Sequence, residues 1–173
     1  MKRAVMVFFL ILLFQGVVYA VDVKIGYVDL QKALNESEGG KRAKSSLEEI
    51  IKAKQKVIDE RGAEIEKLKS EIDKQASLLS PEALKKKQDE LDRKIREYKR
   101  FVQDSQEEVK KKEAELTNEI LKDLVKVVKK IGKEEKYTII LEKAEGLILY
   151  ADNAIDLTDK VIKRYNEEIK TKK

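Results

Sequence analysis

The chain has 173 residues, of which 41% are charged and 6% aromatic, and its formal net charge is +5. It contains no Cys and no His, which excludes disulfides, thiol catalysis, typical zinc sites and Ser-His-Asp chemistry, and we predict neither a metal nor a cofactor. Such a charged chain is either disordered or built mostly of long helices, and the spacing of its aliphatic residues decides between the two.

The first 20 residues have the pattern of a secretory signal peptide. The basic pair Lys2-Arg3 precedes an unbroken apolar run over Ala4–Phe14, and the segment Val18-Tyr19-Ala20 predicts cleavage before Val21. The apolar run is shorter than the roughly 20 residues that a membrane-spanning helix needs. We therefore predict a cleaved signal peptide and a mature chain outside the cytoplasm; an uncleaved N-terminal anchor is the alternative.

Residues 21–40 are predicted to form the N-terminal part of a small body. Val23, Ile25 and Tyr27 alternate with polar or small residues, which predicts a strand over Val23–Asp29 with one buried face. A short helix is expected over Leu30–Glu36, followed by a bend at the Gly39-Gly40 pair.

Residues 41–133 carry heptad spacing, with a thin apolar seam on a charged surface. Ser80, Pro81 and Glu82 interrupt it with the signature of a sharp helix start. Two ladders joined by a tight turn predict an antiparallel helical hairpin with its tip near 79–83 and arms of about 60 Å at 1.5 Å per residue. The second ladder is expected to end at Gly132. The ladders are Leu47, Ile51, Ile58, Ile65, Leu68, Ile72 and Leu79, then Leu84, Leu91, Ile95, Tyr98, Val102, Val109, Leu116 and Ile120, continuing to Leu124, Val127 and Ile131.

Residues 134–173 are predicted to complete the body. Tyr137–Lys143 and Leu147–Tyr150 read as a β-hairpin turning at Glu145-Gly146, and Asp156 is expected to cap a last helix. The fold class is therefore α+β and mostly helical, with a small β-strand body and a long protruding helical hairpin. Three strands give little core, so we predict oligomerisation through the body. The strand residues expected to form that interface are Val23, Ile25, Tyr27, Ile139, Leu141, Leu147 and Leu149.

Charge is unevenly distributed along the chain. Residues 41–133 hold 26 basic and 20 acidic side chains, whereas the body is net acidic. The excess near the arm tip predicts attraction to anionic surfaces such as phosphate-bearing lipid head groups, although a solvated coiled-coil surface also mixes such charges. The aromatics are too sparse for nucleic-acid binding. The basic tip residues are Lys85, Lys86, Lys87, Arg93, Arg96 and Arg100.

Four apolar arm residues, Ile50, Val57, Leu78 and Phe101, lie off the main ladders. They either widen the seam or face the space between neighbouring arms, where scattered aliphatics could hold an unfolded chain weakly at many points. Gly62, inside the first arm helix, is either a flexible point or a tolerated substitution.

Several segments, in this order, resemble the Skp/OmpH family of periplasmic chaperones. They are Lys24–Leu30, Tyr137–Glu142, Leu149–Asp152 and Asp156–Lys163. The resemblance implies a homotrimer whose strands form a central body, with three arms around a cavity that captures unfolded outer-membrane β-barrel proteins. For lipopolysaccharide it implies only a general role for basic arm tips.

We therefore predict an ATP-independent periplasmic holdase and no enzyme. A holdase binds the unfolded state of its client and so prevents aggregation by mass action. The alternative is a structural coiled-coil hairpin adaptor that links components of the cell envelope.

Overall fold

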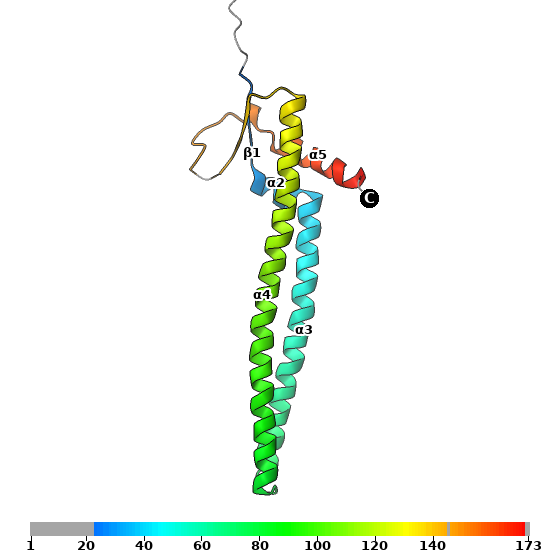
Figure 1. The fold of residues 1–173 in the computed structure, drawn as a ribbon, viewed down its shortest axis with the longest axis vertical. Helices are drawn as coiled ribbons and strands as arrows, with labels where there is room; N and C mark the ends of the chain where they lie inside the picture. Colours follow the sequence, from blue (N-terminus) through cyan, green and yellow to red (C-terminus); the bar gives the residue numbers. More distant parts are fainter. Residues whose placement is uncertain (1–22, 145, 172–173) are drawn as a thin grey trace, which may run out of the picture.

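The computed structural model describes residues 23–144 and 146–171. The predicted signal peptide and the Glu145 turn position lie outside these residues. Figure 1 shows two long helices side by side, projecting from a small body at one end. The elements in chain order are β1 (Ile25–Val28), α2 (Leu30–Glu36), α3 (Glu38–Gln75), α4 (Pro81–Glu134), β2 (Ile139–Glu142), the 3-10 helix η1 (Asn153–Ile155) and α5 (Thr158–Thr171).

The predicted helical hairpin is confirmed, and its turn forms as the sequence indicates. The Ser80 hydroxyl accepts a hydrogen bond from the Ala83 N–H at 3.2 Å, and Pro81 opens α4. Before the turn, the N–H groups of Leu78 and Leu79 both donate to the Gln75 carbonyl, which closes the end of α3. With 38 residues, α3 is about 57 Å long, so the hairpin cannot fold back into the body.

The joint between body and arm lies at Ser37, which corrects the predicted bend at Gly39-Gly40. Both glycines belong to the first turn of α3, and the Ser37 hydroxyl accepts a hydrogen bond from the Gly40 N–H at 3.1 Å. A Cβ on Gly40 would lie 1.7 Å from the Leu34 carbonyl oxygen. The glycine is therefore needed for the close approach of α2 and α3.

The sheet formed by the described residues has two parallel strands, and the predicted β-hairpin is wrong. β2 pairs with β1, with Ile25 opposite Ile139 and Tyr27 opposite Leu141. The segment 147–150 lies in a turn and irregular backbone, and is not a strand. Because the helical arm returns the chain to the end of the body where it began, β2 can run beside β1 in the same direction.

Burial on β1 also differs from the predicted alternation. Tyr27 is buried as expected, but Val23 and Ile25 are 55% and 43% exposed, and Val28 is buried. Leu157 packs against the face of β1 opposite to Ile25 and Tyr27. A Cβ on Gly26 would point to that face and would lie 2.6 Å from the Leu157 Cδ1. The C-terminal half of β1 is therefore enclosed, while its N-terminal half presents apolar side chains to the surface.

The last turns of α4 belong to the core of the body. Leu124, Val127 and Ile131 are buried together with Ala33 of α2 and Val161 of α5. α4 continues past Gly132 to Glu134, contrary to the predicted end, and Lys136 then adopts a left-handed conformation with φ of 58°.

The start of α5 is stabilised by Asp156, as predicted. The Asp156 carboxylate accepts a hydrogen bond from the Thr158 N–H at 2.8 Å, and Val161 and Tyr165 are buried on the predicted apolar stripe.

Two glycines of α3 should respond in opposite ways to alanine. Gly40→Ala should lower the free energy of unfolding by at least about 2 kcal/mol, because the new Cβ collides with backbone. Gly62→Ala should raise it by about 1 kcal/mol, because a Cβ there lies 3.9 Å from the Tyr98 ring and the helix gains propensity. Urea unfolding followed by circular dichroism measures both. Equal stability of the two variants would contradict this account of the joint.

Candidate functional site: the arm and the apolar face of the body

The arm seam is continuous but thin. Most ladder residues are half-buried, and only Ile72 of α3 is fully buried. Ile51, a predicted seam residue, is 44% exposed. The two helices therefore hold each other through a narrow apolar strip, and part of that strip remains accessible.

The four predicted client-contact residues differ in exposure, and Leu78 at the arm turn lies far from the other three. Ile50 and Val57 are half-buried beside the seam. Phe101 is also half-buried, and the Arg61 guanidinium lies over its ring at 4.0 Å from the centroid. Leu78 at the turn is 84% exposed. The structure therefore does not bring these residues together into one patch.

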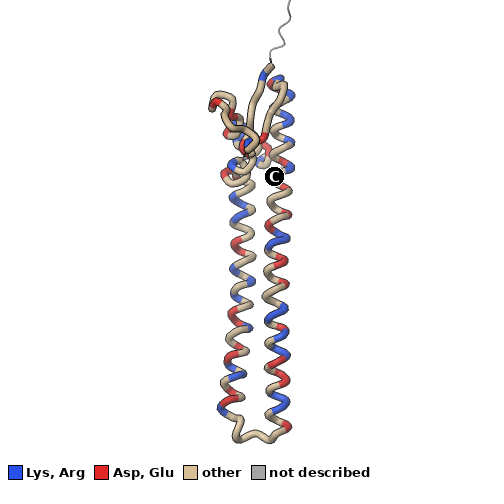
Figure 2. The backbone as a smooth tube through the Cα atoms, turned by 90° about the vertical axis from the view of Figure 1, so that its left-hand side faces the viewer, with Lys and Arg blue, Asp and Glu red and all other residues tan. Residues whose placement is uncertain are grey.

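The predicted basic residues lie on the first turns of α4. All are exposed except the half-buried Lys87. Arg100 pairs with Asp104 at 3.6 Å, and within the described chain the other five form no ion pair. Figure 2 shows basic and acidic residues mixed along both helices, with an uncharged turn at the end of the hairpin. Contact with anionic lipid remains a prediction.

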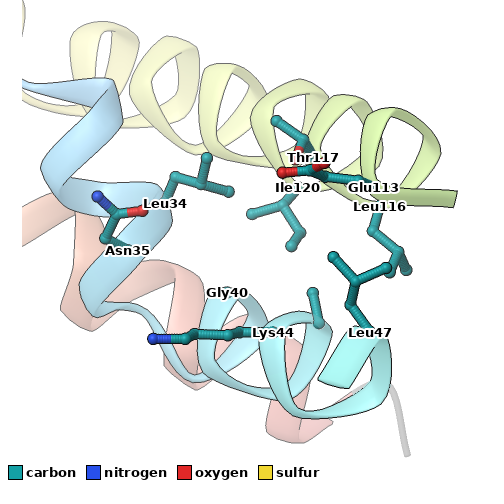
Figure 3. A pocket seen from close by; sticks show the side chains of 10 residues that line it. Leu34, Asn35, Gly40, Lys44, Leu47, Glu113, Leu116, Thr117 and Ile120 are labelled. Atoms are coloured by element: carbon teal, nitrogen blue, oxygen red, sulfur yellow. The ribbon is translucent and has the colours of Figure 1, made fainter. Parts of the chain in front are cut away.

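A pocket of about 510 Å³ lies at the arm root, where α2, α3 and α4 meet. Figure 3 shows Leu34 from α2, Leu47 from α3, and Leu116 and Ile120 from α4 directed into this space. Gly40 forms part of its wall. The pocket marks the level at which the seam of the arm gives way to the core of the body.

A second space, of about 390 Å³, lies between the arm helices halfway down the hairpin. Its lining includes Ser105, which is 3% exposed and whose hydroxyl has no hydrogen-bond partner among the described residues. Ser105 is not among the site residues predicted from the sequence. A signal existed, because Ser105 continues the four-three ladder between Val102 and Val109.

One side of the body presents apolar residues to solvent. Val23, Ile25, Ile139 and Leu141 are 43–55% exposed on or beside the two strands. Leu147 and Leu149 are 74% and 95% exposed, but they do not lie on strands, which corrects their assignment as strand residues. Tyr27 is buried within the chain and so does not belong to this face.

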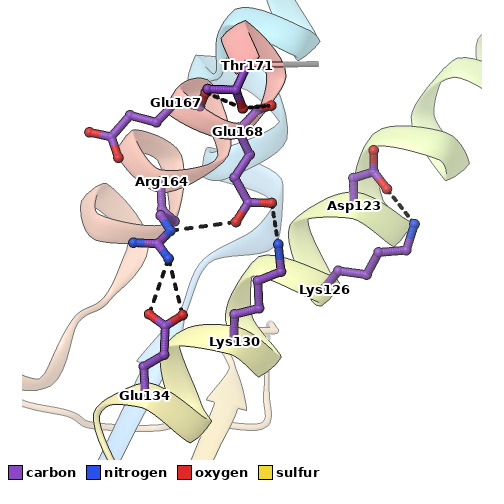
Figure 4. Close-up of polar contacts among 8 residues, drawn as sticks. All are labelled: Asp123, Lys126, Lys130, Glu134, Arg164, Glu167, Glu168 and Thr171. Atoms are coloured by element: carbon purple, nitrogen blue, oxygen red, sulfur yellow. Dashed lines mark hydrogen bonds and ion pairs between the residues drawn. The ribbon is translucent and has the colours of Figure 1, made fainter.

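Ion pairs fix α5 against the last turns of α4. Figure 4 shows Lys130 bonded to Glu168 at 2.6 Å, and Arg164 reaching both Glu168 and Glu134. The hydrogen bond from Lys130 holds the pKa of the Glu168 carboxyl below its ordinary value. Lys160 does the same for Glu135, whose pKa is also lowered by the charge of Lys24.

Within residues 23–144 and 146–171, none of the helices combines the length and the apolar character required to cross a membrane.

A long antiparallel helical hairpin on a small two-stranded body defines a class of helical-arm proteins. The family model described as Outer membrane protein (OmpH-like) matches residues 24–165. The chain belongs to this family, the Skp/OmpH outer membrane chaperones, which is not a family of enzymes. The resemblance found in the sequence is thereby confirmed.

Among solved structures, the chain is similar to a protein of Caulobacter crescentus CB15, whose crystal structure is described as that of a candidate outer membrane chaperone (OmpH-like). The TM-score is 0.80 at 20% sequence identity, and the match covers 86% of this chain and 86% of that chain. At this identity the likeness shows the fold. No curated protein matches the chain significantly.

Acid should weaken the junction between α4 and α5. A carboxyl whose pKa is lowered on folding stabilises the protein above its unfolded pKa of about 4.5, and this contribution is lost as the pH falls through the folded value. Replacing Glu135 and Glu168 by Gln should therefore reduce the loss of unfolding free energy, measured by urea denaturation, as the pH falls below about 4.5. The matched control is Glu66→Gln on the exposed face of the arm. Parallel profiles for wild type and the double variant would contradict the assignment.

Proposed function

We propose that this protein is an ATP-independent periplasmic holdase for unfolded outer-membrane β-barrel proteins. The observation that carries the proposal is the projecting α3–α4 hairpin, a long charged wall on which apolar groups such as Ile51 and Leu78 remain accessible. Many weak apolar contacts along such a wall hold an unfolded chain without a single tight site. Family membership supports the client class, and the signal-like pattern of residues 1–20 supports secretion.

The proposal includes a homotrimer in which the body of each copy covers the apolar face of another. Ile25, Ile139 and Leu141 lie close together on the two paired strands and are each more than two-fifths exposed. Leu149 and Tyr150 are almost fully exposed, at 95% and 87%. Water contact of this apolar surface is unfavourable by roughly 25 cal/mol per Å², so association of copies through it is favourable. Association would set several arms around one cavity.

The holdase activity can be measured by light scattering. An outer-membrane β-barrel protein diluted from urea should aggregate alone and remain dispersed with an equimolar amount of the assembled protein, in the absence of nucleotide. The chain without residues 1–20 is the form to use. If scattering is unchanged while the protein is folded and oligomeric, the holdase proposal is wrong, and the structural adaptor becomes the better explanation.

The interface proposal predicts a selective effect of charge on the body. Ile25→Asp combined with Leu141→Asp should convert the oligomer to monomer in sedimentation analysis, because two carboxylates would be buried unpaired. Leu78→Asp is the matched control, since it places the same charge on an exposed apolar residue of the arm turn. An oligomer that survives the double substitution would rule out this face as the interface.

A further inference from the structure

The free end of the arm differs in character from its sides. Residues 75–81 carry no charged side chain, and Figure 2 shows this uncharged turn closing the hairpin between two helices of mixed charge. Within the turn, Leu78 is 84% exposed and Leu79 is half-buried. A single exposed leucine is ordinary on a protein surface. Its meaning here comes from the charges that surround it and from its position at the end of the arm.

Cations flank the apolar turn on both helices. The tip segment, residues 74–87, holds four basic side chains and one acidic one, whereas residues 101–119 of α4 hold three and six. Lys74, Lys85 and Lys86 are exposed, and within the part of the chain that the structure describes none of the three forms an ion pair. The tip segment therefore presents uncompensated positive charge around an exposed leucine.

The shape of the tip segment restricts the kind of partner. It is the convex end of a projecting hairpin, and the length of α3, about 57 Å, holds it clear of the body (Figure 1). A folded protein partner receives an apolar anchor in a matching pocket. A bilayer needs no such pocket, because its head-group region deforms around a convex end. It also supplies both an apolar layer for the leucine and phosphates for the lysines.

We propose that the tip segment docks on an anionic phospholipid bilayer, with Leu78 inserted at the boundary of head groups and acyl chains. Lys74, Lys85 and Lys86 keep their ammonium groups at the level of the lipid phosphates while their stems lie along the apolar layer. The proposal goes beyond the holdase function, because it assigns the free end of the arm a partner other than the client. Each lysine near such a surface strengthens binding by about fivefold, so one tip binds reversibly and several tips in one assembly bind more tightly.

An unfolded client is the competing partner, because its chain also offers apolar groups to an exposed leucine. A client held between arms contacts their sides, whereas Leu78 lies at the turn that closes the hairpin. The test must therefore measure membrane binding and client dispersal on the same variants.

The first experiment uses the chain without residues 1–20, because the apolar run Ala4–Phe14 would bind vesicles by itself. The sequence contains no Trp, so Leu78→Trp introduces a single fluorescent probe. Its emission should shift to the blue with phosphatidylcholine vesicles that contain about one third phosphatidylglycerol, and not with pure phosphatidylcholine vesicles. Added salt should reverse the shift, because it screens the lysines. Ser45→Trp, exposed on α3 about 50 Å from the turn, is the matched control and should show no shift.

Co-sedimentation with the same anionic vesicles separates the charged from the apolar contribution. Lys85→Gln combined with Lys86→Gln should weaken binding by at least about tenfold, and Leu78→Ser by at least about threefold. Lys110→Gln combined with Lys111→Gln removes the same charge from exposed positions in the middle of α4, well beyond a Debye length from the tip. This matched control should change binding by less than about twofold. Circular dichroism melting checks that each variant is folded.

A folded wild-type chain that does not sediment with anionic vesicles, equal shifts from the two Trp positions, or equal losses from the two lysine pairs would overturn the proposal. A Leu78→Ser variant that binds vesicles like the wild type but disperses less client would also overturn it, by assigning the tip to the client. The scattering assay keeps the two proposals distinct. Dispersed client without vesicle binding leaves the holdase intact and rejects the membrane contact, whereas vesicle binding without dispersal retains the contact and rejects the holdase.

Discussion

The packing of Leu124, Val127 and Ile131 against α2 and α5 joins the arm to the body. These residues lie on the same continuous helix whose earlier turns form the seam of the hairpin, so α4 serves both parts of the molecule. Without this burial, the two-stranded sheet would have no layer to cover it, and a sheet of two strands is marginal by itself. The ion pairs from Arg164 and Lys130 surround the apolar contact and fix the direction in which α5 lies.

The arm, unlike the body, has little buried apolar surface. Its seam is narrow, its outer surfaces are charged, and its middle contains a space that the chain does not fill. An element with few buried apolar contacts opens locally at lower free energy than the rest of a protein. A binding wall for clients of varied sequence benefits from this property, because it can adjust without unfolding the body that supports it.

Elements with strong local signals were predictable from the sequence. Heptad spacing, the Ser80-Pro81 start of α4 and the stripe on α5 depend on contacts near in sequence, so the pattern specified them. The sheet was not predictable in this way, because β1 finds its partner more than 100 residues later. Leu147–Tyr150 looked like a strand because its composition favours one, but no described strand of the same chain pairs with it. The bend was misplaced because Gly39 and Gly40 serve close packing, which periodicity does not report. For the candidate site, residue type and spacing named basic and apolar candidates on the arm, and their roles stay predictions. The pocket at Ser105 required knowing which residues face one another across the seam.

The separation between β1 and β2 has a consequence for the order of folding. β1 leaves the ribosome early, yet it cannot pair until the whole arm and the start of β2 have been made. Closing so long a loop is entropically unfavourable, whereas a helical hairpin zips together from its turn through neighbouring residues. Once the helical hairpin has formed, it brings β1 and β2 to the same end of the arm. The two strands then need to search only a short distance before they pair in parallel.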